Sequence, residues 1–121
     1  MAYDIHVART KDWLDAATAP ITKNDVDSLL ANDAELAWST TDYMEMKYNG
    51  VVTRYFAILW RGVPCFFWYR DQIQCSGPDE AQQLKLAQIA RLLNACAVGD
   101  DGERYEIKRG LFGKEKLVVV A

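Results

Sequence analysis

The chain contains one histidine, three cysteines and no long apolar run in its 121 residues. The lone imidazole, His6, excludes metal sites and mechanisms that need two. The cysteines, Cys65, Cys75 and Cys96, lack the C-x-x-C spacing of a zinc site or a dithiol redox pair. No apolar segment approaches the roughly 20 residues of a membrane helix, and the opening residues lack a secretory leader. We therefore expect a cytoplasmic protein with no metal, no cofactor and no membrane partner.

Acidic residues outnumber basic residues by 17 to 14, and the two kinds are unevenly distributed. Residues 1–50 carry nine acids and four bases, whereas residues 104–121 carry five bases and two acids. A nucleic-acid-binding protein normally gathers Lys and Arg on one face. The body of this chain shows no such cluster, so nucleic acid is not expected as a partner. Half of the residues are apolar, enough for a single domain, residues 1–121, to bury a core.

The spacing of apolar residues predicts an α+β fold, with two helices at about 22–33 and 78–97 beside a mainly antiparallel sheet of about five to six strands. Thr22 and Asp25 have the spacing of a capping box at the start of the first helix. Pro78 suits the first position of the second helix, and an apolar stripe continues from there to Ala97. The polar segment 10–20 is expected to be a loop pinned by Trp13.

Strands are expected where apolar and polar residues alternate or where β-branched and aromatic residues gather. The first lies around residues 3–8, with His6 partly exposed on the face opposite Ile5 and Val7. Asn49-Gly50 is the strongest hairpin signal. Further strands are expected at 41–48, 52–61, 64–70, 72–75 and 104–108, with a turn at 99–103, and the apolar run 117–120 is expected to dock.

Two of these strands, 52–61 and 64–70, are apolar on both faces. We expect them to be central strands covered on both sides, because such strands are commonly near-continuous apolar runs. The alternative is an aromatic face that is exposed for a partner.

Reactive groups are not arranged as an enzyme would need them. The chain has no G-x-G-x-x-G, P-loop or G-x-S-x-G motif. The acidic turn 99–103 is too short for an EF-hand and is expected to be solvated. Folding could bring Asp42 or Glu45 near Asp71 as a general acid and base, but their spacing does not single them out. Cys65 and Cys96 are expected to pack in the core. We expect a binding protein rather than an enzyme.

Acidic and aromatic side chains share the first part of the chain and suggest one binding surface. Carboxylates steer the encounter with a basic partner, while aromatic anchors supply affinity. An ordinary solvated rim explains the same residues equally well. The set comprises Asp12, Asp15, Asp42 and Glu45 among Trp13, Trp38, Tyr43 and Tyr48.

Several short segments also resemble a group of small bacterial α/β proteins of unassigned activity. Similar chains are found beside polymorphic toxins of the Rhs and type VI secretion class, where they would act as immunity proteins. The segments are Tyr3-Asp4-Ile5 with Arg9 and Trp13, Pro20-Ile21-Thr22, Pro78-Asp79-Glu80-Ala81, and Gly99-Asp100-Asp101-Gly102-Glu103 with Tyr105. The chain departs from the pattern at Gly77 and extends beyond it over residues 106–121.

The resemblance implies a protein that binds a cognate secreted antibacterial toxin and occludes its active site, with an ADP-ribosyltransferase as the most specific candidate. A toxin that uses NAD must keep an open cleft, which a rigid domain can cover. The residues expected to contact the toxin are Tyr43, Glu45, Tyr48, Trp68 and Asp71. Two alternatives remain: a small-ligand domain with a closed aromatic pocket between helix 78–97 and the sheet, and, third in order, a hydrolase-type enzyme that uses carboxylates.

Overall fold

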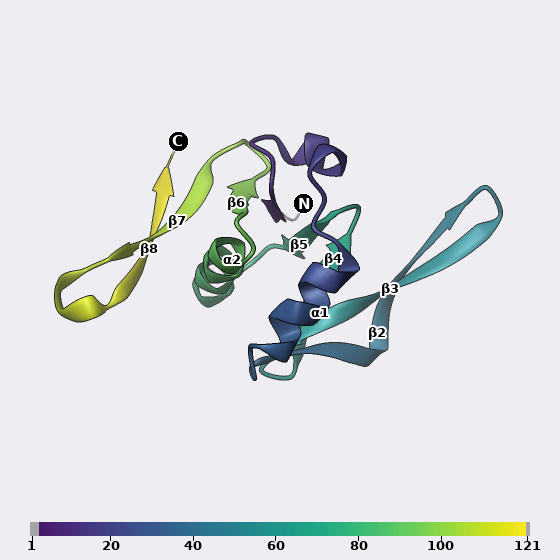
Figure 1. The fold of residues 1–121 in the computed structure, drawn as a ribbon, viewed down its shortest axis with the longest axis horizontal. Coiled ribbons are helices and arrows are strands. Elements are labelled where there is room, and N and C mark those ends of the chain that lie inside the picture. The colour runs from purple at the N-terminus through teal and green to yellow at the C-terminus, as the bar shows by residue number, and fades with distance from the viewer. Residues whose placement is uncertain (1–2, 121) are drawn as a thin grey trace.

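A computed structural model describes residues 3–120; residues 1, 2 and 121 of the expected domain lie outside the described part (Figure 1). Two α-helices and two 3₁₀ turns accompany eight strands. In chain order the elements are β1 (Asp4–Ala8), η1 (Trp13–Thr18), α1 (Lys23–Ala31), β2 (Leu36–Tyr48), β3 (Val51–Trp60), β4 (Val63–Tyr69), β5 (Gln72–Ser76), α2 (Glu80–Leu92), β6 (Cys96–Gly99), β7 (Arg104–Arg109), η2 (Leu111–Gly113) and β8 (Glu115–Val120).

The strands form one sheet in the order β2-β3-β4-β5-β1-β6-β7-β8, and every neighbouring pair is antiparallel. The α+β class is confirmed, but the expected number of strands is wrong: there are eight rather than five to six. The second helix was expected to reach Ala97, but it ends at Leu92, and residues 96–99 form the separate strand β6. A short buried strand such as 96–99 is a continuous apolar run, and its period cannot be told from that of a helix.

Both helices begin at capping boxes. Thr22 accepts a hydrogen bond from the amide of Asp25, whose carboxylate accepts from the Thr22 amide in return. Asp79 and Gln82 do the same for α2, so the N-cap is Asp79 and the helix begins at Glu80 rather than at Pro78. The helix ends early because Asn94 has a left-handed φ of 53°, a conformation that Asn tolerates better than most residues.

The two helices pack on one face of the sheet and η1 covers the other. Ile5 and Val7 join residues of α1 and α2 in the main core. His6 points to the opposite face, where the Trp13 ring stacks on it at 4.0 Å. His6 is only 3% exposed, so the expectation that it is partly exposed is wrong. The segment 10–20, expected as a loop, contains the 3₁₀ turn that covers this imidazole.

Two hairpins project from opposite ends of the sheet, β2–β3 on one side and β7–β8 on the other (Figure 1). Asn49 and Gly50 both have positive φ, at 50° and 77°, which confirms the expected hairpin turn. Docking of the run 117–120 is also confirmed, because β8 pairs along β7. Neither helix of the described chain is both long and apolar enough to span a bilayer.

An ion cluster around the buried Lys85 joins α2 to the loop before β2. Lys85 is 7% exposed, and its Nζ lies 2.7 Å from Asp33 and 3.3 Å from Glu35. Hydrogen bonds from Arg61, Trp60 and Lys85 lower the pKa of Glu35 to about 2. The hydrogen bond from Lys85 likewise holds the pKa of Asp33 below its usual value. Both carboxylates are therefore ionised near neutral pH.

This cluster makes stability fall in acid. A carboxylate with a lowered pKa in the folded state stabilises the fold above its unfolded pKa. We expect the contribution of Asp33 and Glu35 to be present above about pH 4.5 and to be lost as the pH falls toward about 2. Lys85→Met keeps the apolar stem and removes the ammonium. Denaturant midpoints measured from neutral pH into acid should show the wild type losing its advantage over Lys85→Met across this window.

Lys11→Gln is the control, because Lys11 makes no ion pair within residues 3–120. Its midpoint should follow the wild type at every pH. A constant difference between wild type and Lys85→Met from neutral pH to about pH 2 would contradict the assigned role of the cluster.

Candidate protein-binding surface

An irregularity in β2 separates a buried half of the β2–β3 hairpin from an exposed half. Trp38 pairs with Ile58 and Tyr43 with Phe56, so four residues of β2, 39–42, oppose the single residue Ala57. Within this bulge the Ser39 hydroxyl accepts hydrogen bonds from the amides of residues 41 and 42. A bulge bends its strand and changes the direction of the next residues. Here the bend directs residues 43–56 away from the body as a two-stranded extension, which we call the ribbon.

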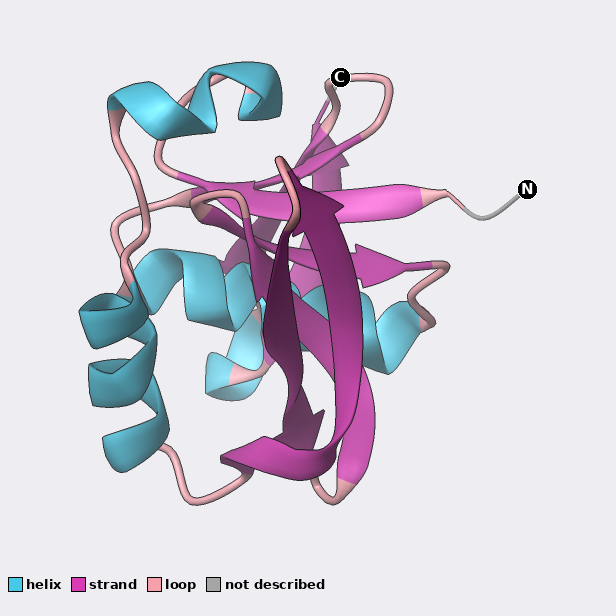
Figure 2. Cartoon of the chain, turned by 90° about the vertical axis from the view of Figure 1, so that its right-hand side faces the viewer, coloured by secondary structure: helices cyan, strands magenta, loops and turns pink. Residues whose placement is uncertain are grey.

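Within residues 3–120, no third strand pairs with the ribbon. Strand β4 pairs with β3 only over residues 57–60, and β2 is the edge of the sheet. The backbone N–H and C=O groups on the two outer edges of the ribbon therefore lack a strand partner. An extended segment of another protein can pair with open edges of this kind. Figure 2 shows the ribbon nearest the viewer, with the rest of the sheet behind it.

Apolar side chains concentrate on the ribbon. Tyr48, at its tip, is 79% exposed. Tyr43 and Phe56 face each other across the strands, with ring centroids 5.5 Å apart. Five of the eleven exposed large hydrophobic residues of the described chain lie here: Tyr43, Tyr48, Val51, Val52 and Phe56. The register places Tyr43, Val52 and Phe56 on one face of the ribbon and Tyr48 and Val51 on the other. Exposed apolar residues gathered on one element in this way mark interaction sites.

This exposure corrects the expectation that strands 52–61 and 64–70 are covered on both faces. Ala57, Ile58 and Phe66 are fully buried, as expected. Residues 51–54 and Phe56 are exposed, because the bulge lifts them off the body.

An aromatic groove of about 670 Å³ lies where the ribbon joins the body. Its lining includes Trp38, Tyr55, Phe56 and Trp68. The indole N–H of Trp68 donates to the carbonyl of Ile21 at 2.7 Å, and that of Trp38 donates to Asp27 at 2.8 Å. Because both polar N–H groups are already bonded, the two indoles offer mainly apolar ring surface to a partner.

The charges around this surface are largely paired. Arg54 lies 3.6 Å from Glu45 and 4.7 Å from the centroid of the Tyr43 ring. Lys23 pairs with Asp27 at 3.1 Å. Hydrogen bonds from Trp38 and then Lys23 lower the pKa of Asp27, so this carboxylate is charged at neutral pH. The apolar content of the ribbon, rather than a net charge, distinguishes it from the rest of the surface.

The five residues expected to contact a toxin occupy three places. Tyr43, Glu45 and Tyr48 lie on the ribbon, and Trp68 lines the aromatic groove. Asp71 lies in the β4–β5 turn with φ 67°, where its carbonyl accepts the amide of Ile21 at 2.9 Å. Its backbone thus anchors the segment before α1.

The acidic aromatic patch suggested by the sequence is divided between two elements. Asp12, Asp15 and Trp13 belong to η1 or its cap, and η1 contacts β1. Asp42 and Glu45 lie on β2.

Sequence reasoning missed the ribbon as a unit. Val51, Val52 and Phe56 lie in segments that the sequence predicts as turn and strand, but their shared exposure was not predicted. The available signal was the polar run Ser-Thr-Thr-Asp at 39–42, because four such residues are typical of a break in a strand rather than its continuation.

A second cluster surrounds His6. Its Nδ1 lies 2.7 Å from Gln72 Oε1 and its Nε2 lies 2.8 Å from Asp100 Oδ1. Asp100 is therefore tied to β1, not simply solvated as the sequence suggested. Potential metal-ligating atoms of Asp4, His6 and Asp100 lie within 4.8 Å of one another. A metal would have to displace the His6–Asp100 bond and the bond from Ser76 to Asp4.

The carboxyl groups with perturbed pKa values do not suit the role of a general acid. A carboxyl group that acts as a general acid near neutral pH needs a raised pKa. Each carboxyl of the described chain whose pKa clearly departs from its usual value is lowered: Asp25, Asp27, Asp33, Glu35, Asp100, Glu103 and Glu115.

Burial raises the thiol pKa of two of the three cysteines, Cys65 and Cys75. Cys75 is buried, whereas Cys65 and Cys96, expected in the core, are only half-buried. Burial raises the pKa of Cys75 to about 12, so this thiol is protonated at neutral pH.

Comparison with known proteins finds no family model, no curated protein and no solved structure that matches the chain. The resemblance to immunity proteins therefore stays an expectation, and the exposed ribbon is the feature from which a function can be inferred.

Proposed function

We propose that this protein is an immunity protein that binds a cognate secreted antibacterial toxin and occludes its active site through the ribbon. The observation that carries the proposal is the exposure of five large apolar side chains on a two-stranded extension. An isolated two-stranded hairpin is only marginally stable in water. A chain that exposes so much apolar surface on such an element gains by burying it against a partner.

The geometry suits blockade rather than chemistry. Aromatic residues with few rotatable bonds are the usual anchors of tight protein interfaces. Tyr43 and Phe56 form a cross-strand pair at the base of the ribbon, and Tyr48 lies at its tip. The ribbon can therefore enter a cleft while the body of the sheet covers the entrance. An NAD-using toxin, such as an ADP-ribosyltransferase, has a cleft of the required kind. No catalytic residue of this protein is needed for that mechanism.

Co-expression with the neighbouring genes tests the proposal. Each adjacent gene is expressed in a laboratory bacterium with and without this protein. We expect one product to stop growth alone, and growth to be restored together with a stable complex when both are made. Growth arrest by neither product, or arrest that this protein does not relieve, would show that the chain is not an immunity protein.

The aromatic groove favours a second candidate, the binding of a small ligand. Its volume and its four aromatic side chains are those of an ordinary ligand site. The pocket expected beside the second helix differs: the cavity between α2 and β6–β7 is about 280 Å³ and is lined mostly by alanines and charged residues around Tyr105. A rise in unfolding temperature with metabolites that Trp68→Ala abolishes would support this alternative.

A further inference from the structure

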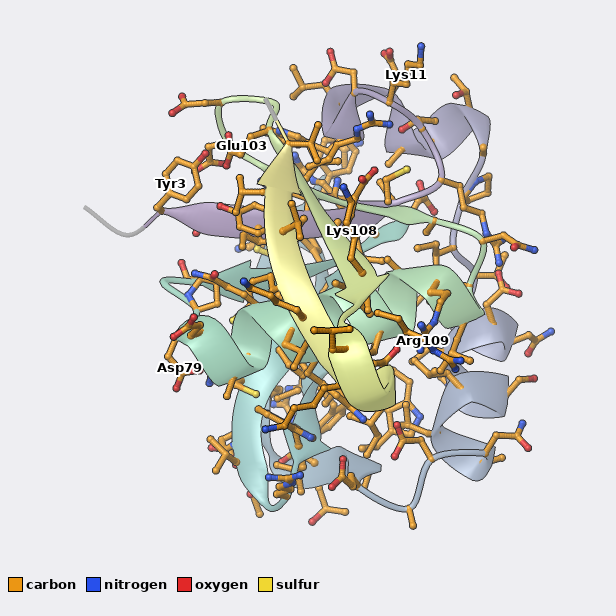
Figure 3. The ribbon with its side chains drawn as sticks, turned by 90° about the vertical axis from the view of Figure 1, so that its left-hand side faces the viewer. Tyr3, Lys11, Asp79, Glu103, Lys108 and Arg109 are labelled. Carbon is orange, nitrogen blue, oxygen red and sulfur yellow. The ribbon has the colours of Figure 1, made fainter. Side chains whose placement is uncertain are left out.

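The β7–β8 hairpin carries an excess of positive charge. Seven of the 14 Lys and Arg residues make ion pairs in the described structure. Of the other seven, four lie within residues 108–116, which we call the basic arm: Lys108, Arg109, Lys114 and Lys116. All four are exposed. Figure 3 shows Lys108 and Arg109 on this hairpin.

The acids near the arm neutralise only part of its charge. Glu115 is the single acid in residues 108–116 and the cross-strand partner of Arg109. Its carboxylate is shared with α2, where it lies 2.7 Å from Arg91 and 3.2 Å from Gln88. Glu106 lies two residues before Lys108 on β7, but its carboxylate is 3.9 Å from Arg104. The acidic turn 99–103 lies at the other end of β7. Glu103 precedes Arg109 by six residues, which is about 20 Å along a strand. That separation exceeds the screening length of about 8 Å at physiological ionic strength.

Two of the arm's lysines face each other at a cost to the fold. Lys108 and Lys116 are direct cross-strand partners. Like charges in this position destabilise a strand pair. The repulsion is relieved when a negatively charged surface lies against the pair.

The tip of the arm is apolar. Leu111 begins the 3₁₀ turn η2 and is 87% exposed, the largest exposure among the large hydrophobic residues of the described chain. The bond from the Gly110 amide to the carbonyl of Lys114, at 2.7 Å, closes the tip. In Figure 1 this tip lies farthest from the body on the left side. Nothing in residues 3–120 covers it.

We propose that the basic arm binds the surface of an anionic lipid bilayer, with Leu111 inserted between the headgroups and the four cations against the lipid phosphates. Cations at a membrane surface are attracted by anionic lipids, and an apolar side chain among them adds burial in the interface. Such contact needs no spanning segment, so the lack of a long apolar run in the sequence does not exclude it. An exposed leucine at the projecting end favours lipid over nucleic acid, whose backbone offers phosphates but no apolar layer.

Vesicle co-sedimentation tests the proposal with the full chain. Vesicles of phosphatidylcholine alone are compared with vesicles that hold an equal share of phosphatidylglycerol. We expect binding to the anionic vesicles only, and its loss in high salt. Lys108→Gln with Lys116→Gln should lower the partition coefficient by about fivefold per cation removed. Leu111→Ser should lower it by about tenfold or more.

The matched control is Lys11→Gln with Leu14→Ser, since both residues are exposed and lie on the opposite end of the chain from the arm. This variant should bind as the wild type does. Thermal unfolding confirms that each variant is folded. Equal binding to neutral and anionic vesicles, or unchanged binding of both arm variants, would overturn the proposal. Binding of a single-stranded oligonucleotide without binding of vesicles would overturn it as well.

Discussion

Phe66→Ala is expected to lower the free energy of unfolding by about 3–5 kcal/mol, the usual cost of removing a fully buried phenylalanine ring. Phe66 is 0% exposed. It lies on β4, pairs with Ile58 of β3, and stacks beside Trp60 with centroids 6.1 Å apart. Because helices, sheet and the base of the β2–β3 hairpin all meet in this core, a cavity here weakens every layer. Denaturant-induced unfolding followed by tryptophan fluorescence measures the change.

The same substitution at Phe56 is the control. Phe56 lies on the ribbon, where it contacts Tyr43 rather than the core. Phe56→Ala should change the free energy of unfolding by about 1 kcal/mol or less. If the two variants lose equal stability, the distinction between a buried core strand and an exposed ribbon is wrong.

Substitutions on the ribbon, which should change stability little, should weaken binding strongly. Tyr43→Ala and Phe56→Ala are each expected to weaken toxin binding by about thirtyfold or more, because aromatic anchors at an interface contribute about 2 kcal/mol or more each. Their effects should not add, since the two rings contact each other. Titration calorimetry with the purified toxin domain, inactivated by mutation where necessary, measures the affinity.

Leu92→Ala is the control for binding. Leu92 is as exposed as the ribbon residues but lies at the end of α2. The affinity of this variant should match the wild type. An affinity that falls with Leu92→Ala and stays unchanged in both ribbon variants would place the interface on the helical side of the molecule.

Local signals in the sequence predicted much of the fold. The capping box of Thr22 and Asp25, the Asn49-Gly50 turn and the alternation in the first strand each depend on residues close in sequence. The end of α2 was wrong because Cys96, Ala97 and Val98 satisfy both a helical stripe and a buried strand. These residues form a strand because β6 pairs with β1 on one side and β7 on the other. Pairing between segments distant in the chain cannot be read from the spacing of residues.

The candidate site was predictable only in part. Tyr43, Glu45 and Tyr48 were chosen for their chemistry, and the fold places them together on the ribbon. Their exposure depends on the bulge at 39–42 and on the early end of the β3–β4 pairing. The burial of His6 depends on Trp13, seven residues away and on another element. These contacts between elements decide which face of a strand is open, and periodicity alone does not contain them.

Backbone hydrogen exchange across the complex tests the central claim, that the ribbon is the surface this protein uses. Amides of residues 43–56 that lack a strand partner should exchange quickly in the free protein. The account predicts that toxin binding slows exchange most strongly in these residues, with smaller changes around Trp38 and Trp68. Unchanged exchange over 43–56, with protection appearing on another face, would contradict it.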